Sequence, residues 1–225
     1  MRRKHIMLDD KIINAPESAY KFVIITLDSH SAGPVSRVQR KLKPYFPSLE
    51  ISVHAAAEWS ENPKALEKAK NDVSNANIIV ANLLFLEEHV KAILPSLKKR
   101  RNECDALVGC ISSKEIVSLT VLDRLDMGKP TTGFLSLLKR LRGTNKSGKP
   151  ASGKRQMSVL RRLPKILKFI PGKAQDVRSY FLTMLYWLGG SDENVESMVI
   201  YLSEKYGGIK AIGDKSAKPP IEYPE

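Results

Sequence analysis

The stretch 21-KFVIITLDSHSAGP-34 joins an apolar run to a short polar turn. Phe22–Leu27 is rich in Val and Ile, which is the pattern of a parallel strand buried on both faces. The turn that follows holds an acid, an imidazole and a glycine, and Pro34 suits the first turn of a helix. Because ligands bind at strand-to-helix turns of open α/β sheets, this stretch predicts both a fold class and the place of a site.

The same strand–helix unit repeats along the first half of the chain. The further predicted strands are Leu49–His54, Asn77–Leu84 and Asp105–Ile111. The predicted helices are Pro34–Lys43, Pro63–Ser74 with Asn62 as its cap, Phe85–Arg101 and Lys114–Leu122. This alternation implies a parallel sheet with right-handed crossovers. We therefore expect an α/β fold with a small, doubly wound, flavodoxin-like parallel sheet of order 2-1-3-4, followed by a helical segment.

The pattern changes after about residue 123, where helical signals replace the alternation. Gly133–Arg142 is predicted as a short amphipathic helix, and 143-GTNKSGKPASGKR-155 as a mobile loop because of its Gly, Ser, Lys and Pro content. Helices are then predicted over Met157–Phe169, Ala174–Leu188 and Asn194–Tyr206, the last capped by Asp192. The predicted organisation is a flexible lead-in (1–19), the α/β domain (20–125), a basic helix and mobile loop (126–156), a helical segment (157–208) and a tail (209–225).

The positive charge is concentrated in one segment. The chain has 37 basic and 24 acidic residues, a net charge of +13, and residues 127–175 contain 13 Lys or Arg and no Asp or Glu. Such a segment can bind nucleic acid, membrane phospholipid or the carboxylates of a small ligand, or it can be a solvated loop. Nucleic acid is disfavoured because aromatic residues are sparse there and no RNA-binding signature is present. The candidates for an anion or partner contact are Lys139, Arg140, Arg142, Lys146, Lys149, Lys154 and Arg155.

Cysteine usage and hydropathy point to a cytoplasmic protein. Cys104 and Cys110 are predicted on one face of a strand as buried thiols, and two cysteines make no disulfide framework. No apolar run approaches the roughly 20 residues of a membrane span. The N-terminus lacks the apolar stretch and cleavage site of a secretory signal. Peripheral contact with a membrane stays open.

The turn after the first predicted strand holds the first candidate ligand-facing residues, Asp28, Ser29 and His30. With Gly33 they satisfy D-x-H-x-x-G, which resembles the signature of cobalamin-binding domains. That signature continues with S-x-L after the third strand, where this chain reads 81-ANL-83, and with two glycines after the fourth strand, where it offers one. The alternative is that Asp28 or Ser29 accepts backbone N–H groups at the helix start and that His30 is incidental.

His54 and Glu58 follow the second predicted strand and are further candidate ligand-facing residues. In this topology His54 and His30 share the carboxyl edge of the sheet, where imidazoles and carboxylates can hold a metal or a basic ligand nitrogen. No recognised metal-ligand spacing joins them, so the metal site stays unassigned.

Glu87-Glu88-His89 is read as a solvated first turn of a helix. The sequence contains no phosphate-binding loop, dinucleotide fingerprint, H-E-x-x-H or catalytic triad, so no catalytic residue is assigned.

Longer strings carry a family resemblance. They are 26-TLDSHSAGP-34, 52-SVHAAAEWSENPKALEKAK-70, 78-IIVANLLFLEEHVKAILPSL-97, 104-CDALVGCISSKEIV-117 and 163-LPKILKFIPGKAQDVRSYFLTMLYWLGGSDENVESMV-199. Together they resemble the N-terminal region of the large, porphyrin-binding H subunits of magnesium chelatases, which are related to the large subunit of cobaltochelatase. The resemblance covers roughly residues 20–225 and is collinear.

The resemblance implies a part in the ATP-dependent insertion of Mg²⁺ into protoporphyrin IX during (bacterio)chlorophyll synthesis. It implies as partners the porphyrin, the rest of the H subunit and two further subunits, one an AAA+ ATPase that binds ATP. It also implies that this chain is an N-terminal part that is not catalytic alone. Insertion requires Mg²⁺ to lose water and two pyrrole nitrogens to lose protons, tasks that suit carboxylates and a histidine such as Asp28 and His30. The alternative is a stand-alone tetrapyrrole- or corrinoid-binding module or a basic docking module.

Overall fold

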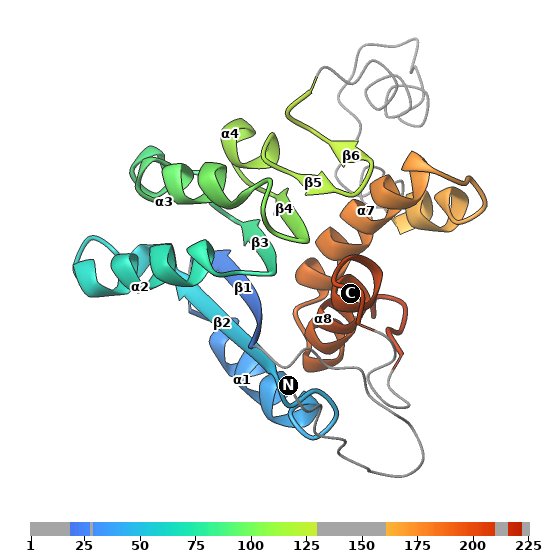
Figure 1. Ribbon diagram of the computed structural model, residues 1–225, viewed down its shortest axis with the longest axis horizontal. Helices are drawn as coiled ribbons and strands as arrows, with labels where there is room; N and C mark the ends of the chain where they lie inside the picture. The colour runs from blue at the N-terminus through green and yellow to red at the C-terminus, as the bar shows by residue number, and fades with distance from the viewer. Residues whose placement is uncertain (1–18, 28, 130–160, 210–215, 222–225) are drawn as a thin grey trace, which may run out of the picture.

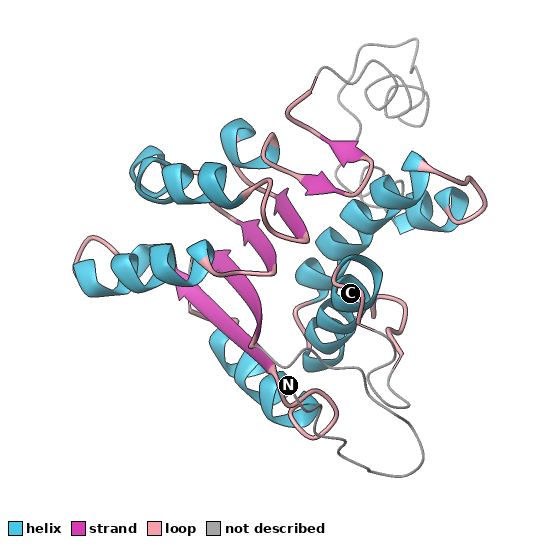
Figure 2. Cartoon of the chain, in the orientation of Figure 1, coloured by secondary structure: helices cyan, strands magenta, loops and turns pink. Residues whose placement is uncertain are grey.

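The computed structural model describes residues 19–27, 29–129, 161–209 and 216–221. At its centre lies a six-stranded sheet of order β2-β1-β3-β4-β5-β6. The strands are β1 (Tyr20–Thr26), β2 (Leu49–Ala55), β3 (Ile78–Asn82), β4 (Ala106–Cys110), β5 (Val121–Leu122) and β6 (Leu125–Asp126). The first four strands pair in parallel, and their arrowheads point to one edge in Figure 2. The predicted parallel order 2-1-3-4 is therefore confirmed.

The helix predicted over Lys114–Leu122 is wrong in its second half. Helix α4 ends at Val117. Strand β5 then pairs antiparallel with β4, and β6 pairs antiparallel with β5. The buried Thr120 hydroxyl donates to the Gly109 carbonyl (3.2 Å) and accepts from the Gly109 N–H (3.0 Å). These bonds tie the segment to β4. Strands of two residues have no periodicity for a sequence to reveal.

Helices cover both faces of the sheet (Figure 1). On one face lie α1 (Ala32–Leu42), α7 (Lys173–Gly189) and α8 (Asp192–Tyr206), and on the other α2 (Pro63–Ser74), α3 (Glu87–Arg100) and α4 (Lys114–Val117). Alternate strand residues feed the two cores: Ile24 packs with the first group of helices and Ile25 with the second. Both side chains are fully buried, as expected for a parallel sheet with helices on each face.

The predicted helical segment packs on the sheet. The helix described over residues 161–167 buries Leu163 and Leu167 in the same core as α7 and α8. Helix α8 also joins α1 through ion pairs, Arg37 to Asp192 and Lys41 to Glu196, each at 2.5 Å. The helical segment thereby completes the third layer beside α1.

Several local signals can be checked against the structure. Asn62 caps α2 as predicted, because its side chain accepts from the Ala65 N–H at 3.3 Å. The predicted cap of α8 is wrong by one residue: Ser191, not Asp192, accepts from the Asn194 N–H.

The two thiols do not share a strand, because Cys104 precedes β4 and is half-buried, whereas Cys110 ends β4 and is buried. Burial raises the pKa of both thiols, to about 11 for Cys104 and about 12 for Cys110.

Some predictions fall outside the described residues. They concern the helix over 133–142 and the loop over 143–155, which together hold the seven basic candidates, and Asp28. Within the part of the chain that the structure describes, no helix is long and apolar enough to cross a membrane.

Candidate functional site

The turns after β1 and β2 meet at the carboxyl edge of the sheet. The backbone N–H of Ala57 donates to the Leu27 carbonyl at 2.8 Å and joins the two turns directly. Ser29 and His30 are exposed in the first turn, and Glu58 is exposed in the 3₁₀ helix η1 (Ala56–Glu58) after β2. The structure therefore brings these three candidates to neighbouring, hydrogen-bonded turns.

Two fully buried polar side chains end the central strands at this edge. Thr26 is the last residue of β1 and Asn82 the last of β3, and both are 0% exposed. Across the described residues, neither the Thr26 hydroxyl nor either polar atom of the Asn82 amide has a hydrogen-bond partner. Burying such a group without a partner costs about 1–3 kcal/mol. An unsatisfied buried group is therefore a reason to look for a function at this edge.

Thr26 and Asn82 lie at the point where the strand order reverses. The register of the two strands pairs Ile25 with Ala81, so Thr26 and Asn82 are the next residues on each strand. Ile24 and Val80, two residues earlier, pack against α1, α7 and α8, which places Thr26 and Asn82 on that same face. In doubly wound sheets of this order, the junction between β1 and β3 is where ligands bind.

The turns after β3 and β4 are strained and cross-linked. Leu83 and Ile111 have φ values of 56° and 48°, in the left-handed region that a β-branched residue such as Ile111 rarely adopts. The Leu83 N–H donates to the Ile111 carbonyl (2.9 Å), and the Ser113 N–H donates to the Leu84 carbonyl (2.8 Å). Strain of this kind collects at functional sites, where surrounding bonds hold it in place.

His54, a predicted ligand-facing residue, is held at a helix. Its side chain is 6% exposed, and its Nε2 atom lies 2.9 Å from an Asp72 carboxylate oxygen on α2. Burial lowers the pKa of His54, and the Asp72 carboxylate opposes that effect. The contact gives His54 a structural role between β2 and α2, and its role toward a ligand stays a prediction.

We expect His54 to make folding depend on pH. Its pKa in the folded state lies below its ordinary value of 6.5. Between these two pKa values the unfolded chain binds a proton that the folded chain does not. The contribution of neutral His54 to the free energy of unfolding is therefore complete above pH 6.5 and decreases as the pH falls below it. Urea unfolding at about pH 7.5 and about pH 5.5 should show this loss, and His54→Gln should reduce it. Equal losses in both proteins would contradict the assignment.

His89 is the residue whose environment the sequence did not reveal. Glu87 and Glu88 are exposed as predicted, but His89 is 7% exposed and lies edge-on to Trp59, with ring centroids 6.1 Å apart. His89, Ile93 and Leu97 follow one another at intervals of four residues and so share the apolar face of α3. This spacing is the sequence signal that could have predicted the burial of His89. Among the described residues, the His89 Nδ1 and Trp59 Nε1 atoms have no hydrogen-bond partner.

The described residues contain no group of three His, Cys, Asp or Glu side chains that could hold a metal ion. Among the described residues, the joined turns after β1 and β2 present the exposed His30 imidazole and the exposed Glu58 carboxylate at this edge. It suits a ligand or a partner segment with polar groups.

Comparison with known proteins agrees with the longer strings of the sequence. A family model described as "Domain of unknown function (DUF3479)" matches residues 21–181. The magnesium-chelatase H subunit of Cereibacter sphaeroides is 52% identical over 206 residues, and that of Rhodobacter capsulatus is 53% identical over 206 residues. Each match covers 92% of this chain and 17% of the relative. The chloroplastic magnesium-chelatase protein ChlH of Oryza sativa subsp. indica is 32% identical over 139 residues, which is 60% of this chain and 10% of the relative.

The two bacterial matches are long enough to extend over the sheet, its carboxyl edge and the helical layer. The chain spans less than a fifth of the length of the relatives it matches. The chain belongs to the DUF3479 family, and its sequence matches magnesium-chelatase H subunits along nearly its whole length.

Proposed function

We propose that this chain acts as one part of the H subunit of a magnesium chelatase. The observation that carries the proposal is the identity of 52% and 53% with two bacterial H subunits over 92% of the chain. The complex would insert Mg²⁺, its substrate, into protoporphyrin IX, with ATP hydrolysed by partner subunits, in (bacterio)chlorophyll synthesis. The chain would work in the cytoplasm with the rest of the H subunit and would not catalyse insertion alone.

We further propose that the carboxyl edge of the sheet faces the porphyrin or a partner segment. Support comes from the exposed Ser29, His30 and Glu58 on joined turns and from the unpartnered Thr26 and Asn82 beneath them. The Asn82 amide offers both donors and acceptors, and the Thr26 hydroxyl offers one of each. Both side chains are fully buried, so a polar part of a ligand would reach them only when the turns above them open. It would then meet groups that have already lost their water on folding.

The exposed side chains suit the proton chemistry of metal insertion. Two pyrrole protons must leave the porphyrin before the metal can bind its nitrogens. Carboxylates and imidazoles are the side chains that act most often as general bases, and Glu58 and His30 supply one of each. The hydrogen bond from the Ala57 N–H to the Leu27 carbonyl joins their two turns and would help to hold both side chains in place relative to a ligand.

The proposal is tested by a chimera in which this chain replaces the matching region of the C. sphaeroides relative. We expect the chimera to form magnesium porphyrin with the partner subunits, whereas deletion of the region abolishes the reaction. Thr26→Val should weaken porphyrin binding without loss of stability, because it removes an unpartnered hydroxyl at constant shape. Glu58→Gln should lower the insertion rate at least about tenfold if the carboxylate accepts a proton.

Two matched variants serve as controls. Thr120→Val removes a buried hydroxyl that makes two hydrogen bonds, so it should lower stability instead. Glu67→Gln makes the same change as Glu58→Gln on α2, where Glu67 pairs with Lys70, and should leave insertion unchanged. A folded but inactive chimera would reject the chelatase role. An active chimera indifferent to Thr26→Val and Glu58→Gln would reject the assignment of the edge.

A further inference from the structure

Three apolar side chains stand exposed at the end of the helix described over residues 161–167. The exposed fractions are 50% for Ile166, 82% for Phe169 and 42% for Ile170. Leu163 and Leu167 on the same segment are buried in the core. The inner face of the helix is thus packed in the core. The outer apolar side chains have no such packing within the described part of the chain.

The exposed residues are held in a fixed turn. The Gln175 side-chain amide donates to the carbonyls of Leu167 (2.8 Å), Lys168 (3.3 Å) and Ile170. Gly172, with φ of 73°, allows the chain to reverse into α7. Phe169 is therefore presented outward by a hydrogen-bonded turn.

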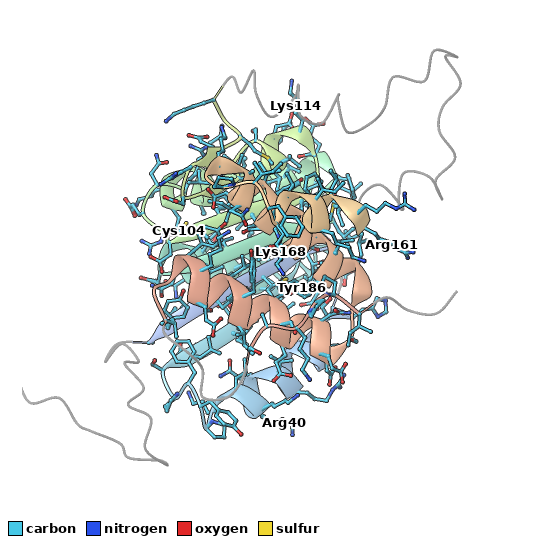
Figure 3. All side chains as sticks on the ribbon, turned by 90° about the vertical axis from the view of Figure 1, so that its right-hand side faces the viewer. Arg40, Cys104, Lys114, Arg161, Lys168 and Tyr186 are labelled. Atoms are coloured by element: carbon cyan, nitrogen blue, oxygen red, sulfur yellow. The ribbon has the colours of Figure 1, made fainter. Side chains whose placement is uncertain are left out.

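Basic side chains surround the apolar ones. Arg162, Lys165 and Lys168 are exposed, and no acidic residue occurs from 161 to 175. Figure 3 shows Arg161 and Lys168 on the face formed by this helix with α7 and α8. We call Arg162, Lys165, Ile166, Lys168, Phe169 and Ile170 the basic apolar tip.

The β5–β6 turn adds no net negative charge beside the tip. The Arg124 guanidinium comes within 3.7 Å of the position that a Cβ would take at Gly172. Arg124 pairs with Asp123 at 3.8 Å, so that carboxylate is balanced. The tip therefore keeps its positive charge.

We propose that the basic apolar tip binds the surface of a membrane that contains anionic phospholipids. A surface with Lys and Arg beside exposed Phe and Ile binds at the headgroup level, where the cations meet phosphates and the apolar groups enter the acyl boundary. Phe169 is presented on an outward turn, which suits insertion into a lipid surface. The basic excess over residues 127–175 adds to the same attraction. Such attachment needs no membrane-spanning helix and does not depend on the proposed role in metal insertion.

The test is co-sedimentation of the 225-residue chain with vesicles. We expect binding to equimolar phosphatidylglycerol and phosphatidylcholine, little binding to phosphatidylcholine alone, and weaker binding at high salt. Phe169→Ser should weaken binding several-fold, and the double change Lys165→Glu and Lys168→Glu at least about tenfold. Circular dichroism and thermal unfolding of each variant confirm that it is folded.

Matched controls carry the same changes elsewhere. Phe85→Ser alters another exposed phenylalanine, and Lys98→Glu with Lys99→Glu reverses two exposed lysines on α3. Both should bind as the unaltered chain does. The proposal is overturned if anionic vesicles do not bind the chain, or if the control variants lose as much binding as the tip variants. It is also overturned if charge reversal abolishes binding while Phe169→Ser has no effect, since that result would mean general attraction to any polyanion.

Discussion

Replacement of Gly109 by alanine should lower the free energy of unfolding by about 3 kcal/mol or more. Gly109 lies in β4, and a Cβ there would sit 2.2 Å from the carbonyl oxygen of Ile116 and 2.8 Å from its carbonyl carbon. These are backbone atoms of α4, so no side chain can rotate away. The helix would have to withdraw from the strand and break the two hydrogen bonds between Gly109 and Thr120.

Urea unfolding followed by circular dichroism measures this loss. The matched control is Gly33→Ala, because a Cβ at Gly33 meets only the flexible end of Arg37 at 3.4 Å. Gly33 lies within α1, where alanine should be neutral or stabilise by up to about 1 kcal/mol. Unfolding of both alanine variants at the same urea concentration would contradict the close packing of α4 on β4 at Gly109.

The parallel core could be predicted from sequence because its physical signals are local. Four apolar runs separated by helix-length segments leave few arrangements for a doubly wound sheet. Asn62-Pro63 marks a helix start by the chemistry of its own side chains. By contrast, β5 and β6 and the early end of α4 depend on Thr120 bonding to Gly109, eleven residues away. Contacts of that kind are tertiary and leave no local trace.

The meeting of the turns after β1 and β2 was predicted, but the surroundings of their side chains were predicted only in part. The turn after β1 and the end of β2 do meet at one edge, as parallel order requires. Which side chains are buried there was not predictable: His54 turns to Asp72, and His89 packs on Trp59. Thr26 and Asn82 gave no signal, since a polar residue at the end of an apolar run is common, and only the structure shows that their polar atoms lack partners among the described residues.

Replacement of Asp176 by alanine should destabilise the protein by about 3 kcal/mol, because it leaves two donors without an acceptor. Asp176 is 3% exposed in the first turn of α7. One carboxylate oxygen accepts from the Tyr206 hydroxyl (2.9 Å) and the other from the Arg124 N–H (3.2 Å), and Lys205 lies 3.8 Å away. Asp176 thus ties α7 to α8 and to the β5–β6 turn.

Thermal and urea unfolding of Asp176→Ala, Tyr206→Phe and the double variant form a cycle that isolates this contact. Tyr206→Phe alone should cost about 1 kcal/mol, and the double variant should cost less than the sum of the two changes. Asp192→Ala is the control, since its carboxylate begins α8 but pairs with Arg37 in an exposed position and should contribute at most about 1 kcal/mol. Equal losses for Asp176→Ala and Asp192→Ala would mean that burial of the Asp176 carboxylate adds nothing. A larger loss of unfolding free energy for Asp176→Ala would show that buried hydrogen bonds of the Asp176 carboxylate, as well as apolar packing, hold the helical layer to the sheet.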